Sequence, residues 1–142
     1  MKILIGSDFK SSNFKNAIKE HLLSKGFEVV DKTEEKNFDF FEASTLVATS
    51  MLNNEGEKAI VIDEYGTGSF NVCVKHKGII CAQVADEHSA KMTRDHNNTS
   101  IITIGSNVTS LEVAKSICEK FILSDYSGGR HQIRVDMLNK MA

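Results

Sequence analysis

The sequence contains no proline, only three cysteines and no long apolar run. Its longest apolar stretches, Ala59–Ile62 and Ile101–Ile104, are far shorter than the ~18 residues that a membrane-spanning helix needs, which excludes that class. Cys73, Cys81 and Cys118 cannot all pair with one another, and none stands in a Cys-x-x-Cys spacing. We interpret them as reduced thiols and expect a cytoplasmic protein.

Neither sign of charge dominates the sequence. The chain has 17 Lys and Arg against 19 Asp and Glu, a formal net charge of −2. A general nucleic-acid binder carries a surplus of basic residues, so the net charge disfavours this class. The net charge does not disfavour a single local basic pocket for an anionic small molecule. The stretch Met1–Gly6 lacks the long apolar segment and cleavage site of a signal peptide, and we expect no leader.

The length of 142 residues is that of one domain, and such a chain can bury about two thirds of its unfolded surface. The apolar fraction of 41% and the charged fraction of 25% are typical of globular proteins. The sequence has no linker, internal repeat or low-complexity segment. We therefore predict a single domain over residues 1–142.

Five short runs rich in Ile and Val are predicted to be strands. They are nearly continuous in apolar residues, which is typical of a parallel sheet covered on both faces. The runs are Lys2–Gly6, Glu28–Asp31, Ala59–Asp63, Ile79–Val84 and Ser100–Gly105.

Between the strands, apolar residues recur at spacings of three and four, which predicts amphipathic helices over about 14–22, 43–51 and 111–122. The last of these opens with Thr109 and Glu112, which have capping-box spacing. A final helix is predicted over about 130–141. Its expected inner side carries Ile133, Met137, Leu138 and Met141.

The element order is β-α repeated five times. It predicts an α/β, three-layer Rossmann-like fold with a five-stranded parallel sheet and helices on both faces. Ligands of such sheets bind at the carboxyl ends of the strands. Asp8, Asp86 and the loop Gly66-Thr67-Gly68 directly follow strands, so we expect them to share one edge of the sheet.

The loop Gly66-Thr67-Gly68-Ser69 lies between a strand and a predicted helix. Its glycines permit a tight turn and expose N–H groups that could bind an oxyanion or an enolate oxygen. The same spacing fits an ordinary βα turn, and both interpretations stay open.

Arg130 and Arg134 stand four residues apart near the start of the final helix, with His131 beside them. Helix dipole and free N–H groups favour an anion there, and two guanidinium groups would form a phosphate clamp. The alternative is a pair of solvated arginines.

The stretch from Thr93 to Asn98 is expected to be a loop before the fifth strand, and it contains His96 and Asn97. Histidine can transfer protons near neutral pH, and an Asn amide can hold a hydroxyl or enediolate oxygen. A surface or capping histidine is the alternative. Asp8 fits either a functional carboxylate or a helix N-cap. No histidine has metal-ligand spacing, and we predict no metal.

Together these segments resemble the ribose-5-phosphate isomerase B / galactose-6-phosphate isomerase family over essentially the whole chain. The segments that carry the resemblance are Gly6-Ser7-Asp8, Gly66-Thr67-Gly68, Ser89–Asn97, Gly105 and Gly128-Gly129-Arg130-His131. The chain's size and the closing stretch 135–141 are most similar to the A-type subunit of heteromeric galactose-6-phosphate isomerases.

The resemblance implies a cofactor-free aldose–ketose isomerase that interconverts D-galactose 6-phosphate and D-tagatose 6-phosphate through an enediolate, in lactose and galactose catabolism. It implies that His96 opens the sugar ring and that Asn97 and Asp8 bind substrate. Arg130 and Arg134 would hold the phosphate. The site would be completed by a neighbouring subunit, on which the helix over about 130–141 is expected to pack.

Three positions depart from the family pattern. Members that work alone carry a cysteine base directly before Gly-Thr-Gly, whereas this chain has Tyr65, whose phenol titrates near ~10 and is a poor base. Phe9 replaces the His of an Asp-His pair, and Phe70 stands where glycine is usual. The chain keeps the residues it would lend to a neighbour and has a degenerate loop, Tyr65–Gly68, of its own. This pattern predicts a hetero-oligomer in which a homologous subunit supplies the cysteine.

Three alternatives remain: a homomeric ribose-5-phosphate isomerase, a non-catalytic sugar-phosphate-binding paralogue, and a phospho-accepting receiver domain. Tyr65 counts against the first, because the proton transfer would lack its base. A receiver would use Asp8 and Asp63 but needs a Lys after the fifth strand, where this chain has Gly105-Ser106-Asn107.

Overall fold

The structure is a computed structural model that describes residues 1–35 and 37–141. Its described strands form one parallel sheet in the order β2-β1-β3-β5-β4. They are β1 (Lys2–Ser7), β2 (Glu28–Asp31), β3 (Lys58–Asp63), β4 (Cys81–Gln83) and β5 (Ile101–Gly105). The predicted parallel α/β fold is confirmed, although β4 is shorter than expected.

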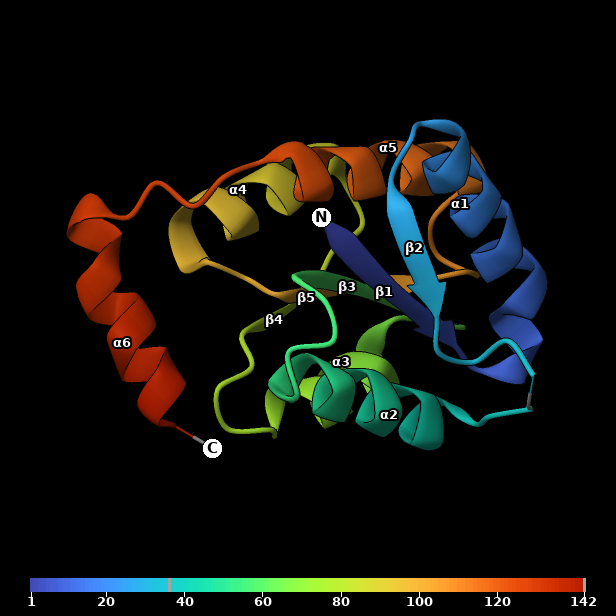
Figure 1. Cartoon of the computed structure of the whole chain (residues 1–142), viewed down its shortest axis with the longest axis horizontal. Coiled ribbons are helices and arrows are strands. Elements are labelled where there is room, and N and C mark those ends of the chain that lie inside the picture. Colours follow the sequence, from blue (N-terminus) through green and yellow to red (C-terminus); the bar gives the residue numbers. More distant parts are fainter. Residues whose placement is uncertain (36, 142) are drawn as a thin grey trace.

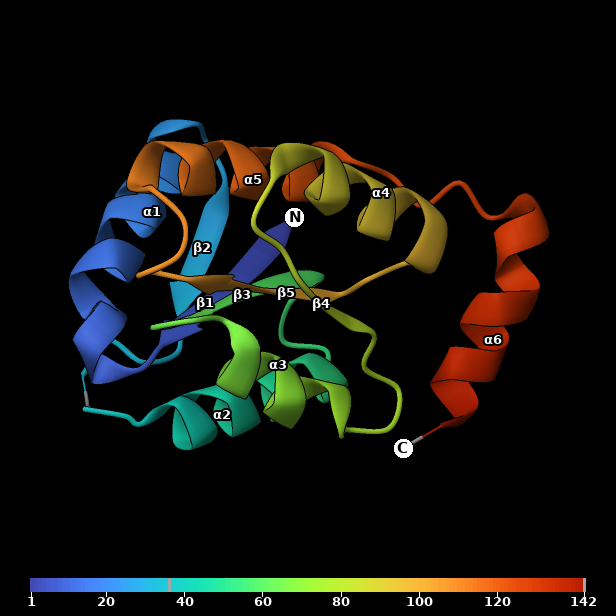
Figure 2. The ribbon, with the colours of Figure 1, turned by 180° about the vertical axis from the view of Figure 1, so that it is seen from behind.

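Helices cover both faces of the sheet (Figure 1, and from behind in Figure 2). One layer holds α1 (Ser12–Ser24), α4 (Glu87–Asn97) and α5 (Leu111–Leu123). The other holds α2 (Phe40–Leu52) and α3 (Thr67–Val74). No helix in the described ranges is long and apolar enough to cross a membrane.

Two apolar cores, one on each face of the sheet, explain the nearly continuous apolar strands. In β1, Ile3 and Ile5 belong to the core beneath α1 and α5, whereas Leu4 belongs to the core above α2. All three side chains are fully buried. Successive strand residues point to opposite faces, so a sheet covered on both sides buries every position.

The expected capping box at the start of α5 is wrong. The N-cap is Ser110, whose hydroxyl oxygen accepts a hydrogen bond from the Val113 N–H at 3.3 Å. The Thr109 hydroxyl is buried and has no hydrogen-bond partner among the described residues. The helix begins at Leu111, so the cap falls one residue later than the Thr109–Glu112 spacing indicated.

A buried lysine holds the end of α5 against the start of β3. The Lys58 ammonium group donates to the carbonyl oxygens of Phe121, Ile122 and Ser124 at 3.2, 2.6 and 2.9 Å. These carbonyls lie at a helix C-terminus, where a cation is favourable. Burial and the nearby Arg94 lower the pKa of Lys58 to about 8. The segment that follows α5 therefore starts at the amino edge of the sheet, beside the first residue of β3.

The last helix, α6 (Gln132–Lys140), stands apart from the layered body (Figure 1). It follows a short 3-10 turn, η2 (Gly129–His131). Val135 is its buried residue, whereas the residues expected on its inner side are exposed. That expectation is wrong for the single chain, because the body does not cover this face. The exposed residues are Ile133, Met137, Leu138 and Met141.

Candidate active site

The carboxyl ends of β1 and β3 lie side by side where the chain order reverses, since β1 pairs with β2 on one side and with β3 on the other. In open parallel sheets this switch point is the usual ligand site. Asp8 follows β1, and the loop Tyr65-Gly66-Thr67-Gly68 follows β3. As predicted, they share the carboxyl edge of the sheet with Asp86, which follows β4.

The Gly66 loop is closed by the chain's own carboxylate. Gly66 has φ +79°, and its N–H donates to Asp63 Oδ1. Ser69 donates to the same carboxylate from its N–H (3.3 Å) and its hydroxyl (3.0 Å). A negative group therefore already occupies the N-terminus of α3. The Asp63 carboxylate therefore holds this loop as a tight βα turn, and it takes two of the N–H groups that an oxyanion hole would need.

Aromatic side chains lie in this loop and against it. Tyr65 is 58% exposed and its carbonyl oxygen accepts a hydrogen bond from Gln83 Nε2 at 3.0 Å. Phe40 lies over Gly68, so close that a Cβ at Gly68 would sit 2.9 Å from the ring. Phe9, at the end of β1, is half exposed. The loop has no thiol, because the three cysteines are buried elsewhere, in α3, β4 and α5.

Asp8 acts as an N-cap. Its Oδ1 accepts a hydrogen bond from the Ser11 N–H at 3.0 Å, which begins the short turn η1 (Phe9–Ser11). Burial raises the pKa of Asp8, and the nearby carboxylates Asp63 and Glu64 raise it further, while the hydrogen bonds with Ser11 lower it. The capping role is therefore present, and the carboxylate also borders a cavity.

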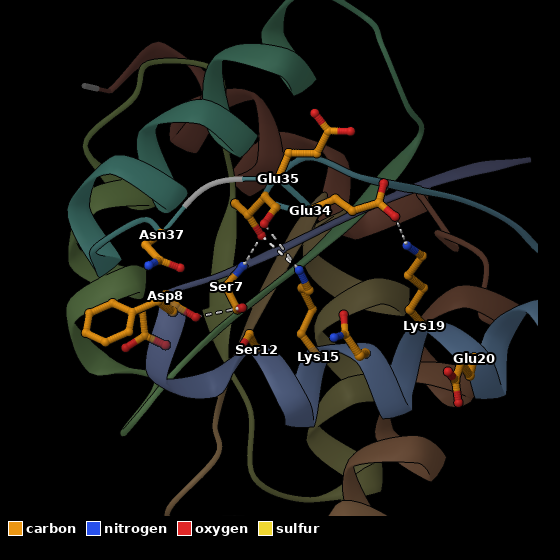
Figure 3. Close-up of a pocket in the computed structure, with 12 residues that line it drawn as sticks. Ser7, Asp8, Ser12, Lys15, Lys19, Glu20, Glu34, Glu35 and Asn37 are labelled. Atoms are coloured by element: carbon orange, nitrogen blue, oxygen red, sulfur yellow. Dashed lines mark hydrogen bonds and ion pairs between the residues drawn. The ribbon is translucent and has the colours of Figure 1, made fainter.

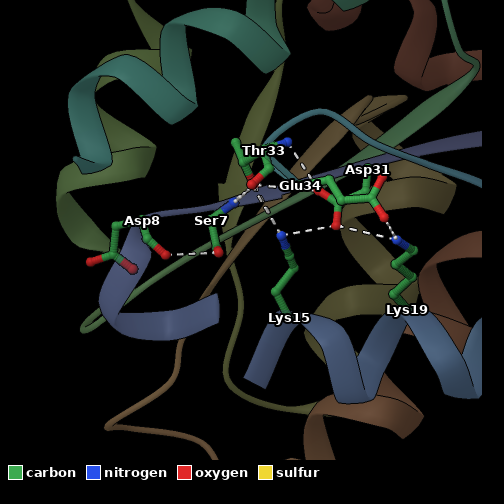
Figure 4. Close-up of polar contacts among 7 residues, drawn as sticks. All are labelled: Ser7, Asp8, Lys15, Lys19, Asp31, Thr33 and Glu34. Atoms are coloured by element: carbon green, nitrogen blue, oxygen red, sulfur yellow. Dashed lines mark hydrogen bonds and ion pairs between the residues drawn. The ribbon is translucent and has the colours of Figure 1, made fainter. Parts of the chain in front are cut away.

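That cavity, of about 460 Å³, opens at the carboxyl ends of β1 and β2 (Figure 3). Among its described lining residues are four carboxylates and two lysines. Figure 4 shows Lys15 and Lys19 rising from α1 towards Asp31. Lys15 pairs with Asp31 at 2.9 Å and donates to Thr33. Lys19 pairs with Asp31 and Glu34. Both ammonium groups are therefore already paired with carboxylates, and the described lining of the cavity offers no free cation to bind a phosphate.

His96 and Asn97 are the last two residues of α4, not part of a loop as predicted. The helix continues through them because Asn98 ends it in a left-handed conformation (φ 53°). α4 starts beyond the carboxyl end of β4 and runs back to the start of β5. His96 and Asn97 therefore lie at the amino edge of the sheet.

Arg130 and Arg134 lie at the same amino edge. Ser127 donates to the Asp95 carbonyl oxygen from its N–H (3.0 Å) and its hydroxyl (2.9 Å), which ties the segment before η2 to the end of α4. Arg130 lies in η2 and Arg134 in α6, so the arginines do not share one α-helix as predicted. Both are exposed, and neither forms an ion pair within the described part of the chain.

The two groups of site residues lie at opposite edges of one sheet. The strand β5 separates them with five residues, roughly 16 Å of extended chain. In Figure 1, α6 and the end of α4 lie on the left, while the β1 arrow points away to the right. One chain therefore cannot bring His96 and its own Tyr65 loop to the same small substrate.

The sequence analysis named Asp63 and His131 but did not predict the contacts that they make. Asp63 closes the loop, a role that its position three residues before Gly66 could have indicated as an Asx-type turn. His131 stacks on His96, with ring centroids 4.3 Å apart and planes 18° apart. The repeat pattern of the sequence does not predict the contact between these two rings. They are 35 residues apart, and the chain that follows α5 has to turn back to bring them together.

A family model described as Ribose/Galactose Isomerase matches residues 3–138. The chain belongs to this family. A protein of Clostridium acetobutylicum called galactose-6-phosphate isomerase subunit LacA is 51% identical over 141 residues, 99% of each chain. The protein of the same name from Staphylococcus aureus is 50% identical over 99% of each chain. That from Enterococcus faecalis is 46% identical over 100% of each chain.

Solved structures of ribose/galactose isomerases share the fold. Ribose-5-phosphate isomerase B of Clostridium thermocellum has a TM-score of 0.93 and 32% identity over 98% of this chain and 95% of that one. The enzyme of Thermotoga maritima has a TM-score of 0.92 and 30% identity over 99% and 98%. That of Mycoplasma genitalium, with bound ribulose 5-phosphate, has a TM-score of 0.89 and 30% identity over 97% and 93%.

Proposed function

We propose that this chain is one subunit of a galactose-6-phosphate isomerase that interconverts D-galactose 6-phosphate and D-tagatose 6-phosphate. Full-length relatives about half identical to it carry that name. One observation carries the proposal that the active site is shared between chains: His96 and the arginines lie at the amino edge of the sheet, while the family's catalytic loop lies at the carboxyl edge. A second subunit has to bring the two together.

In this proposal the chain contributes His96 and the arginines to the partner's site, and its own loop, Tyr65–Gly68, is not catalytic. Tyr65 offers a phenol instead of a thiol, and the Asp63 carboxylate already takes the N–H groups of Gly66 and Ser69. A developing enediolate there would lie near the Asp63 carboxylate, and the N–H groups of Gly66 and Ser69 would not be available to it. At the amino edge, by contrast, His96 and both arginines are exposed and free of ion pairs within the described residues.

We assign each group a step in the isomerisation. His96 transfers the proton that opens the sugar ring, and Asn97 donates a hydrogen bond to a substrate hydroxyl or enediolate oxygen. Arg130 and Arg134 bind the phosphate through charge-assisted hydrogen bonds. The thiolate of the partner subunit removes the proton from C2 of the open-chain aldose and returns it to C1. In the same interconversion O1 gains a proton and the O2 hydroxyl loses one, so the enediolate becomes the ketose with no net change in protons and no cofactor.

Asp8 belongs to the chain's own carboxyl edge. One of its carboxylate oxygens caps η1. Asp8 also lines the acidic cavity of Figure 3, whose lysines are already paired. We propose that Asp8 binds a sugar hydroxyl at this edge, outside the shared catalytic site, and not a phosphate, because the surrounding carboxylates would repel an anion.

The proposed partner is a homologous subunit with a cysteine before its Gly-Thr-Gly loop. Three exposed apolar residues of α6, with Met141 directly after it, provide a surface for it. A space of about 550 Å³ lies between this end of the chain and the β4 edge, and Leu138, Met141, Phe70, Ile79 and Cys81 are among the residues that line it. Phosphorylated sugars and three unpaired, buried thiols support a cytoplasmic location.

The test is His96→Ala in the complex of the chain with a Cys-bearing homologue from the same genome. Loss of a proton-transfer group should lower kcat for galactose 6-phosphate by about 100-fold or more. The matched control is His88→Ala, at the exposed opposite end of α4, which should retain full activity. Unchanged activity of the His96→Ala complex would contradict the shared site.

A homomeric ribose-5-phosphate isomerase is the second candidate, because the solved relatives bear that name. It requires the isolated chain to turn over ribose 5-phosphate without a thiol beside Gly66. Binding of the sugar phosphate by the chain without turnover in any complex would instead indicate a non-catalytic paralogue.

A further inference from the structure

A stacking contact restricts the orientation of the His96 ring. It lies at the exposed end of α4, and no hydrogen bond to its imidazole is present within the described ranges. The ring of His131 stacks on it face to face, with centroids 4.3 Å apart and planes 18° apart. An exposed side chain without such a contact would exchange among rotamers.

The backbone around His131 is built to make this contact. Ser127 is held by two hydrogen bonds to the carbonyl oxygen of Asp95, the residue before His96. The chain then reverses through Gly128 (φ +65°) and Gly129 (φ +58°), conformations that are costly for other residues. The His131 N–H bonds to the Gly128 carbonyl oxygen at 3.1 Å, which closes the turn and returns the ring to α4.

We propose that His131 is a positioning residue: its ring holds the His96 imidazole in the orientation needed for proton transfer to the sugar ring. The proposal rests on the proposed function for the role of His96, but the contact itself does not. In this role His131 touches neither the reacting atoms of the substrate nor its phosphate, and it acts through His96.

The charges around the pair favour this arrangement. The elements that meet here carry Arg130 on η2, Arg134 on α6 and the ion pair of Lys91 with Asp95 on α4. Desolvation, His96 and Arg130 all lower the pKa of His131, so its ring is favoured in the neutral form. A neutral ring can stack on His96 in either protonation state, whereas two imidazolium rings would repel each other.

The kinetic test compares His131→Ala with His131→Phe in the assembled enzyme. Loss of the stack should lower kcat about tenfold with little change in KM, since a misplaced catalytic group affects the transition state. The flat ring of Phe should restore most of kcat, while His88→Ala serves as the matched control. Wild-type kcat in His131→Ala, or a Phe variant as slow as the Ala variant, would overturn the proposal.

A second measurement needs no activity. In the isolated chain, the NMR signals of the His96 ring should move in His131→Ala, because the stacked ring no longer shields them, and should stay close to wild type in His131→Phe. Unmoved signals in His131→Ala would overturn the stack itself. If the wild-type complex proves inactive, the proposed function fails, and these spectra still decide whether His131 positions His96.

Discussion

In the proposed shared site, two residues make this chain's own loop unsuited to isomerisation: Tyr65 and Asp63. Tyr65 stands at the position that we propose for the thiol in the partner subunit, and a phenol is too weakly ionised near neutral pH to act as the base. Asp63 takes the N–H groups of Gly66 and Ser69. Replacing Tyr65 by cysteine would therefore restore the base but would not free the N–H groups of Gly66 and Ser69 to stabilise an enediolate.

The arginines yield a prediction on substrate binding. Arg134→Ala in the assembled enzyme should raise KM for galactose 6-phosphate about tenfold or more, because a hydrogen bond to a charged group contributes ~1.5–3 kcal/mol. Competitive inhibition by inorganic phosphate should weaken in parallel. Initial-rate kinetics measure both, and Arg130→Ala should behave alike.

Lys140→Ala, which removes an exposed cation at the far end of α6, is the control for that prediction. It should leave KM unchanged. Equal KM values for Arg134→Ala and Lys140→Ala would show that the arginines do not bind the phosphate.

At the level of elements, α5 carries a buried thiol that links stability to pH. Burial, with a smaller contribution from Glu119, raises the pKa of Cys118 well above its ordinary value of 9.0. In the unfolded chain the thiol ionises near pH 9, while in the folded chain it stays protonated. Above pH 9 the unfolded state therefore binds fewer protons than the folded state. The contribution of the Cys118 thiol to the stability of the fold is present below pH 9 and is lost as the pH rises above that value.

The free energy of unfolding should therefore fall above pH 9 by up to about 1.4 kcal/mol per pH unit on account of this group. Cys118→Ala should be less stable at pH 7 by about 1 kcal/mol for the small cavity, and should show a shallower decline at high pH. Urea unfolding under reducing conditions measures both. Ser116→Ala on the same helix should keep the wild-type slope, and an equally steep decline in Cys118→Ala would contradict the account.

The strands and the first helices could be predicted from sequence because their signals are local. Runs such as Lys2–Gly6 are apolar on both faces, and the apolar spacing in Ser12–Ser24 is that of a helix. Three details depend on context instead. Asn98 extends α4 through His96, Ser110 displaces the expected cap, and α6 exposes the face that periodicity assigned to a core.

The sequence indicated candidate site residues but not their arrangement in space. His96, Asn97, Arg130 and Arg134 were named from the sequence, and their placement at one edge depends on the two bonds between Ser127 and Asp95. Such a contact joins segments 32 residues apart and leaves no periodic signal. The stack of His96 on His131 and the closure of the loop by Asp63 escaped prediction for the same reason.

At the level of the whole molecule, the apolar face of α6 yields a prediction on assembly. Met137 is 58% exposed in the single chain, so Met137→Glu should leave its fold intact. Burying an unpaired carboxylate at an interface should weaken association with the Cys-bearing partner about 100-fold or more. Light scattering of mixed subunits measures this. Asn139→Glu, an equal change of charge on the same helix, is the control, and equal effects of both would contradict a docking role for the apolar face.

The central claim is that the active site is divided between two different chains. The most direct measurement is galactose 6-phosphate isomerisation by this chain alone, by the Cys-bearing homologue alone and by the two mixed. We predict no significant turnover by this chain alone and activity on mixing, since the two halves of its site lie at opposite edges of the sheet. Comparable activity of the isolated chain and the mixture would contradict the account, because a base other than the partner's thiol would then have to act.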